Sequence, residues 1–532
     1  MKPGNARRLA APGVVLLACL LPLPALWRLP GPPMEEGFML VFPELVLHGR
    51  IPNRDFLHLY GPGGLWVLAA AFKIFGTLLS VERAVGFLQL VGVALGVYAA
   101  VKPWGRWLAA AGGVVTAIVV VPPIGLTALA WVGAVALGLW SVVLARSERR
   151  GAVVASGLLA GTALLYRPDL VVAVALSGLV VLRGLPTRHQ RIRYLGGAAG
   201  GVSPYLVHLA MAGPAAVVRG LLIEPVFELR GGRTLPLPPS WGHFDGFLQR
   251  AGLLNEPPWG LPAPPSPAQL SLWLALLLAA NAALVIAGLA LLRREGTADR
   301  RLLAVALFSV GLLPQALQRA DSTHLAWVSC VPFGLLPAAL VAILRNRVVS
   351  VLTPFLVMVA LVPHFTLRTY VDDVAKSAGA RRIESGAMRR GDRVFYYGRG
   401  DAVVAVRDLL AAIDGVARTG DTLFVGTGDL RKTPYSEAFL YYLLPDLPPA
   451  TRYIEMDPGV ANGEHSGLAD DLAAADVVIL SSVRDDWVEP NASREFGPAT
   501  PNQVLSRDFC RVGSFGTGLF GRGLYELYTR CR

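Results

Sequence analysis

The chain has 532 residues, of which 54% are hydrophobic and only 16% are charged. This balance is too apolar for an ordinary soluble protein. Its net charge of +12 is uneven: residues 1–364 hold 29 Lys/Arg and 14 Asp/Glu, whereas residues 365–532 hold 20 and 23. Basic loops between apolar segments orient a membrane protein, and this distribution argues against nucleic-acid binding. The sequence predicts a polytopic α-helical membrane protein whose C-terminal part, residues 365–532, has a different charge balance from the membrane part.

Apolar segments recur along residues 1–364. The N-terminus places Lys2, Arg7 and Arg8 before the apolar run Val14–Leu23, like a signal peptide, but no small-residue cleavage site is clear. We interpret it as an uncleaved first helix. Runs such as Leu270–Leu292 can cross roughly 30 Å of hydrocarbon as helices. The candidate segments are 9–27, 64–80, 82–101, 107–122, 125–145, 151–166, 169–183, 194–212, 270–292, 301–317, 323–344 and 348–364.

Segment 64–80 decides the predicted topology, because it is short and carries Lys73 near its middle. If it does not cross, all the basic loops between later spans fall on the side of the N-terminus. If it crosses, they all lie outside, against the positive-inside rule. We therefore expect 64–80 to lie along the outer surface. Eleven spans remain, with a cytoplasmic N-terminus, in a multi-pass protein of the plasma or inner membrane.

Two long outer loops, 28–81 and 213–269, interrupt the predicted spans. Eleven of the 14 acidic residues before residue 365 lie on the expected outer side, which suggests a use for carboxylates there. Loop 213–269 is rich in proline and reads as an irregular segment with short interfacial helices. Long loops of this kind are often functional. Its side chains include Trp241, Trp259, Glu224, Glu228 and His243.

Loop 28–81 carries the first cluster of candidate catalytic residues. Glu35 and Glu36 begin a predicted amphipathic helix over 35–48, and Arg54 and Asp55 follow in the same loop. Adjacent helical residues point about 100° apart, so one glutamate at most faces a pocket. A simpler interpretation is that the glutamates favour the positive helix N-terminus. Arg54 and Asp55 could equally form a salt bridge within the loop.

Two more Arg–Asp pairs stand at the outer ends of predicted spans. Arg167 and Asp169 form one, and Arg319 and Asp321, followed by His324, form the other. Arginine suits bidentate contacts with phosphate. The alternative is a snorkelling arginine with a local ion pair. Because all three charged clusters share one side of the membrane, the sequence favours a polar site there.

The composition changes after residue 364, and we expect an extracytoplasmic α/β domain over 365–532. Its predicted strands are Arg393–Tyr397, Thr422–Val425, Asp476–Leu480 and Leu524–Tyr528, and its predicted helices are Asp401–Ile413 and Ser436–Leu443. Residues 475–481 are typical of a buried parallel strand. Cys510 and Cys531 could pair in an oxidising compartment. Cys19 and Cys330 lie in hydrophobic spans, where we expect packing roles.

Several catalytic signatures are missing from the sequence. There is no Walker loop, no H-E-x-x-H, no G-x-S-x-G elbow and no convincing zinc spacing of Cys and His. Nucleotide hydrolysis and metalloproteolysis therefore lack support.

The outer loop resembles that of the GT-C glycosyltransferases, which include protein O-mannosyltransferases and lipid A aminoarabinose transferases. The resemblance rests on the acidic pair Glu35-Glu36 with Gly37, on G-x-x-P-x-R-D-F over 49–56, and on a helix closing in Phe75-Gly76. It covers residues 34–83 by motif and extends through 364 by span pattern. Residues 365–532 are similar, on weaker grounds, to the outer domains of actinobacterial cell-wall arabinosyl- and mannosyltransferases.

The resemblance implies a GT-C-like catalytic domain over 1–364 that moves a sugar from a polyprenyl-phosphate donor to a glycan or protein acceptor at the bilayer surface. It implies that Glu35 or Glu36 is the catalytic base and that Asp55 assists. The family's Lys-Pro-Pro is replaced here by Tyr60-Gly61-Pro62-Gly63, so arginines would have to contact the donor phosphate. No cofactor is implied, although Glu35, Glu36 and Asp55 could ligate a divalent cation. The expected donor-binding residues are Arg54, Tyr60, Arg167, Asp169, Arg319, Asp321 and His324.

Two other functions remain open from the sequence. A transporter or flippase for a lipid-linked glycan would explain the spans and the interfacial arginines, although no half-to-half repeat is evident. A membrane-anchored binding protein would place the activity in residues 365–532.

Overall fold

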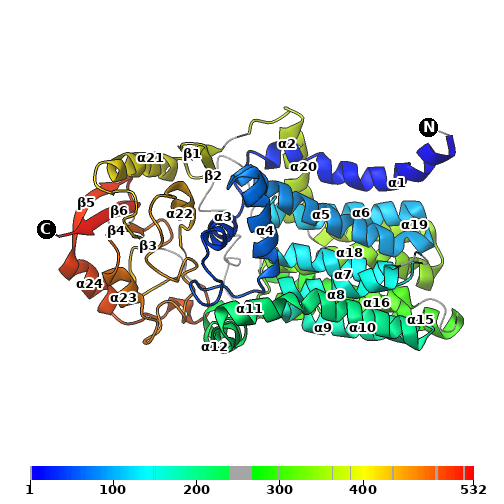
Figure 1. Cartoon of the computed structure of the whole chain (residues 1–532). Helices are drawn as coiled ribbons and strands as arrows, with labels where there is room; N and C mark the ends of the chain where they lie inside the picture. Colours follow the sequence, from blue (N-terminus) through cyan, green and yellow to red (C-terminus); the bar gives the residue numbers. More distant parts are fainter. Residues whose placement is uncertain are drawn as a thin grey trace.

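The computed structural model describes residues 3–147, 149, 151–238, 267–295, 300–361, 363–383, 385–433, 436–485, 489–518 and 522–531. Figure 1 shows a bundle of long helices on one side and most of the C-terminal region, residues 365–532, on the other; within that region, α20 (Thr369–Ser377) lies beside α2 (Leu23–Leu26) at the bundle. The N-terminal helix begins at the end of the bundle that is remote from the C-terminal region (Figure 1). Helices α3 (Pro33–Leu47) and α4 (Gly63–Phe75) lie between the two parts.

The helices of the bundle coincide with the predicted spans. They are α1 (Pro3–Leu20), α2 (Leu23–Leu26), α5 (Leu79–Val101), α6 (Arg106–Ile124), α7 (Ala130–Leu144), α8 (Ala152–Tyr166), α9 (Val171–Gly184), α10 (Arg188–Val202), α11 (Pro204–Ala212), α15 (Pro267–Glu295), α16 (Arg301–Val310), α17 (Leu313–Gln318), α18 (Ser322–Leu344) and α19 (Arg347–Leu361).

Within the described residues, six helical segments are long and apolar enough to cross a membrane, and a bent pair would make seven. The six are Leu9–Leu26, Leu79–Trp104, Arg106–Ile124, Ala268–Arg294, Arg301–Gln318 and Ser322–Leu344. Shorter apolar helices, among them α7 and α8, pack with them. The chain is therefore a multi-pass membrane protein. A helix can cross hydrocarbon because its backbone N–H and C=O groups are hydrogen-bonded to one another.

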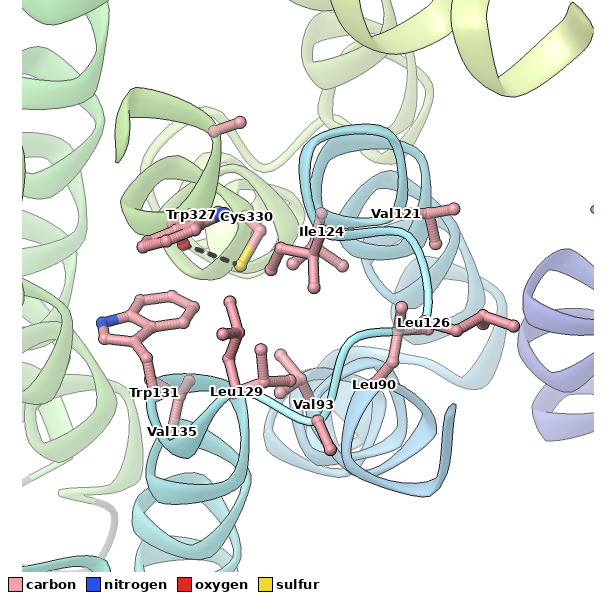
Figure 2. Close-up of a cluster of buried hydrophobic side chains, with 14 of the residues drawn as sticks. Leu90, Val93, Val121, Ile124, Leu126, Leu129, Trp131, Val135, Trp327 and Cys330 are labelled. Atoms are coloured by element: carbon pink, nitrogen blue, oxygen red, sulfur yellow. Dashed lines mark hydrogen bonds between the residues drawn. The ribbon is translucent and has the colours of Figure 1, made fainter. Parts of the chain in front are cut away.

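Close helix contacts and a dense apolar core hold the bundle together. At the α8–α10 contact a Cβ at Gly161 would lie 2.1 Å from the Ala198 carbonyl oxygen, and one at Gly201 would lie 2.3 Å from the Leu158 carbonyl oxygen. Small residues permit such close approach between membrane helices. Figure 2 shows the apolar cluster between α5, α6, α7 and α18, with labelled members Leu90, Val93, Val121, Ile124, Leu126, Leu129, Trp131, Val135, Trp327 and Cys330.

The two loops between spans form helices at the bundle end that faces the C-terminal region. Loop 28–81 forms α3 (Pro33–Leu47) and α4 (Gly63–Phe75), and α4 lies across the bundle instead of along it (Figure 1). Loop 213–269 starts with α12 (Pro214–Val218), the π-helix η3 (Arg219–Glu228) and α13 (Arg230–Arg233). The chain bends by 119° between α11 and α12. Trp241, His243 and Trp259 lie outside the described residues.

The C-terminal region contains a two-stranded hairpin and a mixed sheet of order β3-β4-β6-β5. Strand β4 is entirely buried and runs parallel to β3 and antiparallel to β6, which confirms the parallel strand predicted at 475–481. The strands are β1 (Gly386–Arg390), β2 (Arg393–Tyr397), β3 (Leu423–Thr427), β4 (Val477–Ser481), β5 (Phe509–Phe515) and β6 (Tyr525–Arg530). The helices are α20 (Thr369–Ser377), α21 (Gly400–Asp414), α22 (Phe439–Leu443), α23 (Leu468–Ala473), η5 (Ala492–Arg494) and α24 (Thr500–Asp508).

Two of the four cysteines are paired, as the sequence allowed. Cys510 on β5 and Cys531 just after β6 form a disulfide, whereas Cys19 and Cys330 are free and buried in the bundle.

Strands β1 and β5 were not predicted, because neither has an apolar alternation: β1 reads GAMRR and β5 reads FCRVGSF. Pairing with β2 and β6, not composition, makes them strands.

The C-terminal region packs directly on α3. A Cβ at Gly37 would lie 2.9 Å from the backbone nitrogen of Phe439 on α22, so only glycine allows this approach without a shift. At the other end of α3, Arg393 Nη1 donates to Glu44 Oε2 at 2.8 Å. The α3 helix is thus held between the bundle and the C-terminal region.

Candidate active site

A cavity of about 520 Å³ lies where the bundle, α3, η3 and the C-terminal region meet. Its polar lining includes residues of both parts of the chain: Glu35, His58, Tyr60, Arg167, Asp169, Arg233, Gln315, Gln318, Arg319, His324, Glu455, Asp457, Glu489 and Ser493. Because the bundle and the C-terminal region both line the cavity, the polar site forms only when the two parts of the chain are packed together.

The two glutamates at the start of α3 point in different directions. Glu35 lines the cavity, and its Oε2 atom is buried with no hydrogen-bond partner among the described residues. Glu36 is fully buried away from the cavity and forms a bidentate ion pair with Arg83 of α5, with N–O distances of 2.8 and 2.9 Å. Arg83 Nη1 also donates to the carbonyls of Leu26 and Trp27. This network fixes the first turn of α3 and directs Glu35 toward the cavity.

Burial raises the pKa of Glu35 to about 8. Within this net shift, a backbone hydrogen bond and the guanidinium groups of Arg233 and Arg319 lower the pKa, and the carboxylate of Glu455 raises it. Removing a carboxylate from water disfavours its charged form. A carboxyl group with a pKa near the working pH is suited to general base catalysis.

Arg167 stands at the end of α8 and is held by three neighbours. Its guanidinium makes a bidentate pair with Asp169, with N–O distances of 2.8 and 2.6 Å, and contacts Gln315 Oε1 at 3.1 Å. The guanidinium carbon lies 4.1 Å from the centre of the Tyr60 ring, a cation–π contact. The sequence predicted a polar site containing Arg167, Asp169 and Tyr60, and the structure places all three at the cavity.

Arg319, just after α17, and His324, in the first turn of α18, both line the cavity. Asp321 caps this helix by accepting from the His324 backbone N–H at 2.8 Å, and it also contacts His324 Nδ1 at 2.8 Å. Arg319 Nε reaches Asp321 Oδ2 at 3.3 Å. Asp321 is therefore behind the cavity wall, where it orients both Arg319 and His324.

The sequence did not predict eight polar residues of the cavity lining, and four of these eight are acidic residues or arginine: Arg233, Glu455, Asp457 and Glu489. Arg233 forms ion pairs with both Glu455 and Asp457, and Arg319 Nη2 lies 2.5 Å from Glu489 Oε1. Tyr453-Ile454-Glu455-Met456-Asp457 alternates in a way that places two carboxylates on one face of an extended segment. That alternation was the available signal; nothing in the sequence indicated Glu489.

Arg54 and Asp55 do not line the cavity. Asp55 accepts from the Ile51 backbone N–H at 2.7 Å and pairs with Arg54 at 2.8 Å. Arg54 is half exposed and donates to the Met211 carbonyl at 3.1 Å. The pair therefore stabilises its own loop and links it to α11, which corresponds to the simpler interpretation of the sequence.

The remaining wall of the cavity is apolar. Trp131 and Trp327 stack with ring centres 5.9 Å apart. At the other side, Val171, Leu222 and Val226 both line the cavity and are 43–51% exposed on the surface of the helices. The cavity thus borders an apolar outer surface at the start of α9 and on η3, where a hydrocarbon chain can reach a polar interior.

No group of three or more His, Cys, Asp or Glu side chains within the described ranges is placed to hold a metal ion. Glu35, Glu36 and Asp55, the possible ligands proposed from the sequence, are not brought together: they face the cavity, Arg83 and Arg54, respectively.

The fold is that of the GT-C membrane glycosyltransferases. Crystallised ArnT from Cupriavidus metallidurans bound to undecaprenyl phosphate superimposes over 98% of both chains, with a TM-score of 0.52 and 12% sequence identity. An oligosaccharyltransferase from Archaeoglobus fulgidus matches 96% of this chain and 73% of its own, with a TM-score of 0.44 and 14% identity. The mycobacterial arabinofuranosyltransferase AftD matches 98% of this chain and 41% of its own, with a TM-score of 0.41 and 15% identity. No protein-family model and no curated protein sequence matches the chain.

Proposed function

We propose that this protein is an inverting glycosyltransferase that moves a sugar from a polyprenyl-phosphate donor to a cell-envelope acceptor on the outer face of the membrane. The observation that carries the proposal is the cavity, which joins a carboxyl group of raised pKa, buried arginines and an apolar opening. The resemblance in fold to ArnT, crystallised with undecaprenyl phosphate, supports the same donor class.

In this mechanism Glu35 accepts the proton of an acceptor hydroxyl while the hydroxyl oxygen attacks the anomeric carbon. The bond from that carbon to the donor phosphate oxygen breaks, and its electron pair leaves with the lipid phosphate. Arg167, Arg233 and Arg319 stabilise the charge that develops there. The polyprenyl chain lies along the apolar opening at Val171, Leu222 and Val226.

The other predicted site residues take supporting roles in the proposal. Tyr60 and Asp169 hold Arg167, and Asp321 orients Arg319 and His324, which borders the sugar. Glu36, Arg54 and Asp55 shape the loops that position Glu35. Residues 365–532 supply the acceptor side of the cavity.

The proposed topology has eleven spans, a cytoplasmic N-terminus and residues 365–532 outside. The Cys510–Cys531 disulfide supports the outer location, because disulfides persist in oxidising compartments.

Transfer of a labelled sugar by purified protein tests the function. The substrates are polyprenyl-phosphate mannose and polyprenyl-phosphate arabinose, offered with a cell-envelope extract as acceptor. We expect free polyprenyl phosphate and a labelled acceptor in equal amounts. Movement of the lipid-linked sugar across vesicle membranes, with no sugar transferred to the acceptor, would instead support the transporter or flippase function.

The rate of transfer should depend on pH through Glu35. Burial raises the pKa of Glu35 to about 8, and only the deprotonated carboxylate can accept a proton. We therefore expect kcat/KM to rise tenfold per pH unit below about pH 8 and to level off above it. A pH profile from about pH 5.5 to about pH 9.5, which spans that pKa, measures this. A flat profile would contradict the assignment of Glu35 as base.

A further inference from the structure

The arginines of the cavity are already occupied by carboxylates. Arg319 Nη1 and Nη2 donate to Glu489 at 3.0 and 2.5 Å, Nη1 also donates to the Arg233 carbonyl at 2.8 Å, and Nε reaches Asp321 at 3.3 Å. A guanidinium has five N–H groups, so four of those of Arg319 point at protein atoms. A phosphate can gain a bidentate contact with Arg319 only where Glu489 now lies.

The carboxylates differ in how firmly they are attached to their arginines. Asp169 is two residues from Arg167 and stays beside it through local geometry. Glu489 is 170 residues from Arg319, and Glu455 and Asp457 are 222 and 224 residues from Arg233. These three carboxylates reach the cavity from the C-terminal region. They are the contacts that a shift of that region can break.

Burial explains why such partners are needed when no donor is bound. Glu489 is 3% exposed and Arg319 is 8% exposed. An arginine left unpaired at such a depth is strongly unfavourable. A carboxylate presents two oxygens to a guanidinium in the same bidentate geometry as a phosphate. Glu489 is therefore well suited to occupy the place of a phosphate, and the two anions repel each other if both are present.

We propose that Glu489, together with Glu455 and Asp457, occupies the phosphate-binding positions of Arg319 and Arg233 in the empty protein and is displaced when the lipid phosphate binds. This inference rests on the proposed function and adds its regulation: the C-terminal region contacts the arginines only when the donor is absent. Donor binding thereby changes the acceptor side of the cavity.

The test is binding of undecaprenyl phosphate to the full chain in detergent, measured by microscale thermophoresis, for the wild type and for Glu489→Gln. Glutamine keeps the shape of the side chain but loses the charge that competes with phosphate. We expect the dissociation constant to fall by about tenfold, equivalent to about 1.4 kcal/mol. Glu495→Gln, an exposed position six residues along the same segment, is the matched control and should bind as the wild type does.

Undecaprenol, which has the tail without the phosphate, should bind the wild type and Glu489→Gln equally. If Glu489→Gln binds undecaprenyl phosphate no more tightly than the wild type, displacement is wrong although the proposed function stands. If the wild type prefers undecaprenyl phosphate no more than undecaprenol, the phosphate site itself fails, and the proposed function fails with it.

Two further measurements do not depend on the folding of one variant. Glu455→Gln/Asp457→Asn should tighten binding in the same direction, with the exposed Asp470→Asn as control. Hydrogen–deuterium exchange of the wild type should increase in peptides covering 453–458 and 489–494 when undecaprenyl phosphate is added. Unchanged exchange in both peptides would contradict displacement.

Discussion

Replacing Glu35 with glutamine should reduce kcat for sugar transfer by about 10²–10⁴-fold, the range that a positioned general base contributes. Glutamine has the size of the protonated side chain but cannot accept the proton of an acceptor hydroxyl. Since burial raises the pKa of Glu35 to about 8, the native side chain is itself largely uncharged at neutral pH. The thermal unfolding midpoint of Glu35→Gln should therefore equal that of the wild type, and the KM for the donor should change little.

The measurement is single-turnover transfer of a labelled sugar, with donor binding determined in parallel. The exposed Glu464→Gln is a suitable control, because it removes a carboxylate from the C-terminal region without touching the cavity. Full transfer activity in Glu35→Gln would show that another group is the base. A lower unfolding midpoint would indicate a structural role.

Replacing Glu36 with glutamine should, in contrast to Glu35→Gln, greatly reduce the stability of the folded protein. Glu36 and Arg83 are 0% and 1% exposed, and each is the other's charged partner. Removing one member of such a pair leaves a buried charge uncompensated, at a cost of about 3–5 kcal/mol. Thermal unfolding in detergent, followed by tryptophan fluorescence, should show a marked decrease in the midpoint.

The double variant Glu36→Leu/Arg83→Met separates charge from packing. It removes both charges and keeps apolar volume, so it should unfold at a higher temperature than Glu36→Gln alone. If Glu36→Gln is as stable as the wild type, the pair does not fix the first turn of α3. The positioning of Glu35 would then need another explanation.

Adjacent residues Glu35 and Glu36 illustrate the limit of the sequence within the site. Helical geometry predicts that the two side chains point in different directions, but it does not predict which of them lines a cavity. That choice follows from Arg83, 47 residues further on, which pairs with Glu36 on the bundle side. The same applies to Arg54 and Asp55, whose pairing within their loop is local, while their distance from the cavity is set by how the loop packs on α11.

What the sequence by itself determined is the set of elements. The apolar segments of residues 1–364 are largely helical, because an apolar segment in hydrocarbon must satisfy its own backbone hydrogen bonds. Within the described residues, six or seven helical segments are long and apolar enough to cross a membrane, fewer than the eleven predicted spans. The apolar run at 475–481 similarly predicted a buried strand, β4, since little but the interior of a sheet accepts it. These are outcomes of local composition.

Only the tertiary structure decided which charges distant in the sequence meet. Arg233 joins Glu455 and Asp457 across more than 220 residues, and Arg319 joins Glu489 across 170. No periodicity links such positions, because ion pairing across a cavity depends on how α3, η3 and the C-terminal region pack. Gly37 against Phe439 and Glu44 with Arg393 set that packing. The polar site is therefore a product of docking between two parts of the chain, whereas each part's helices and strands follow from its own residues.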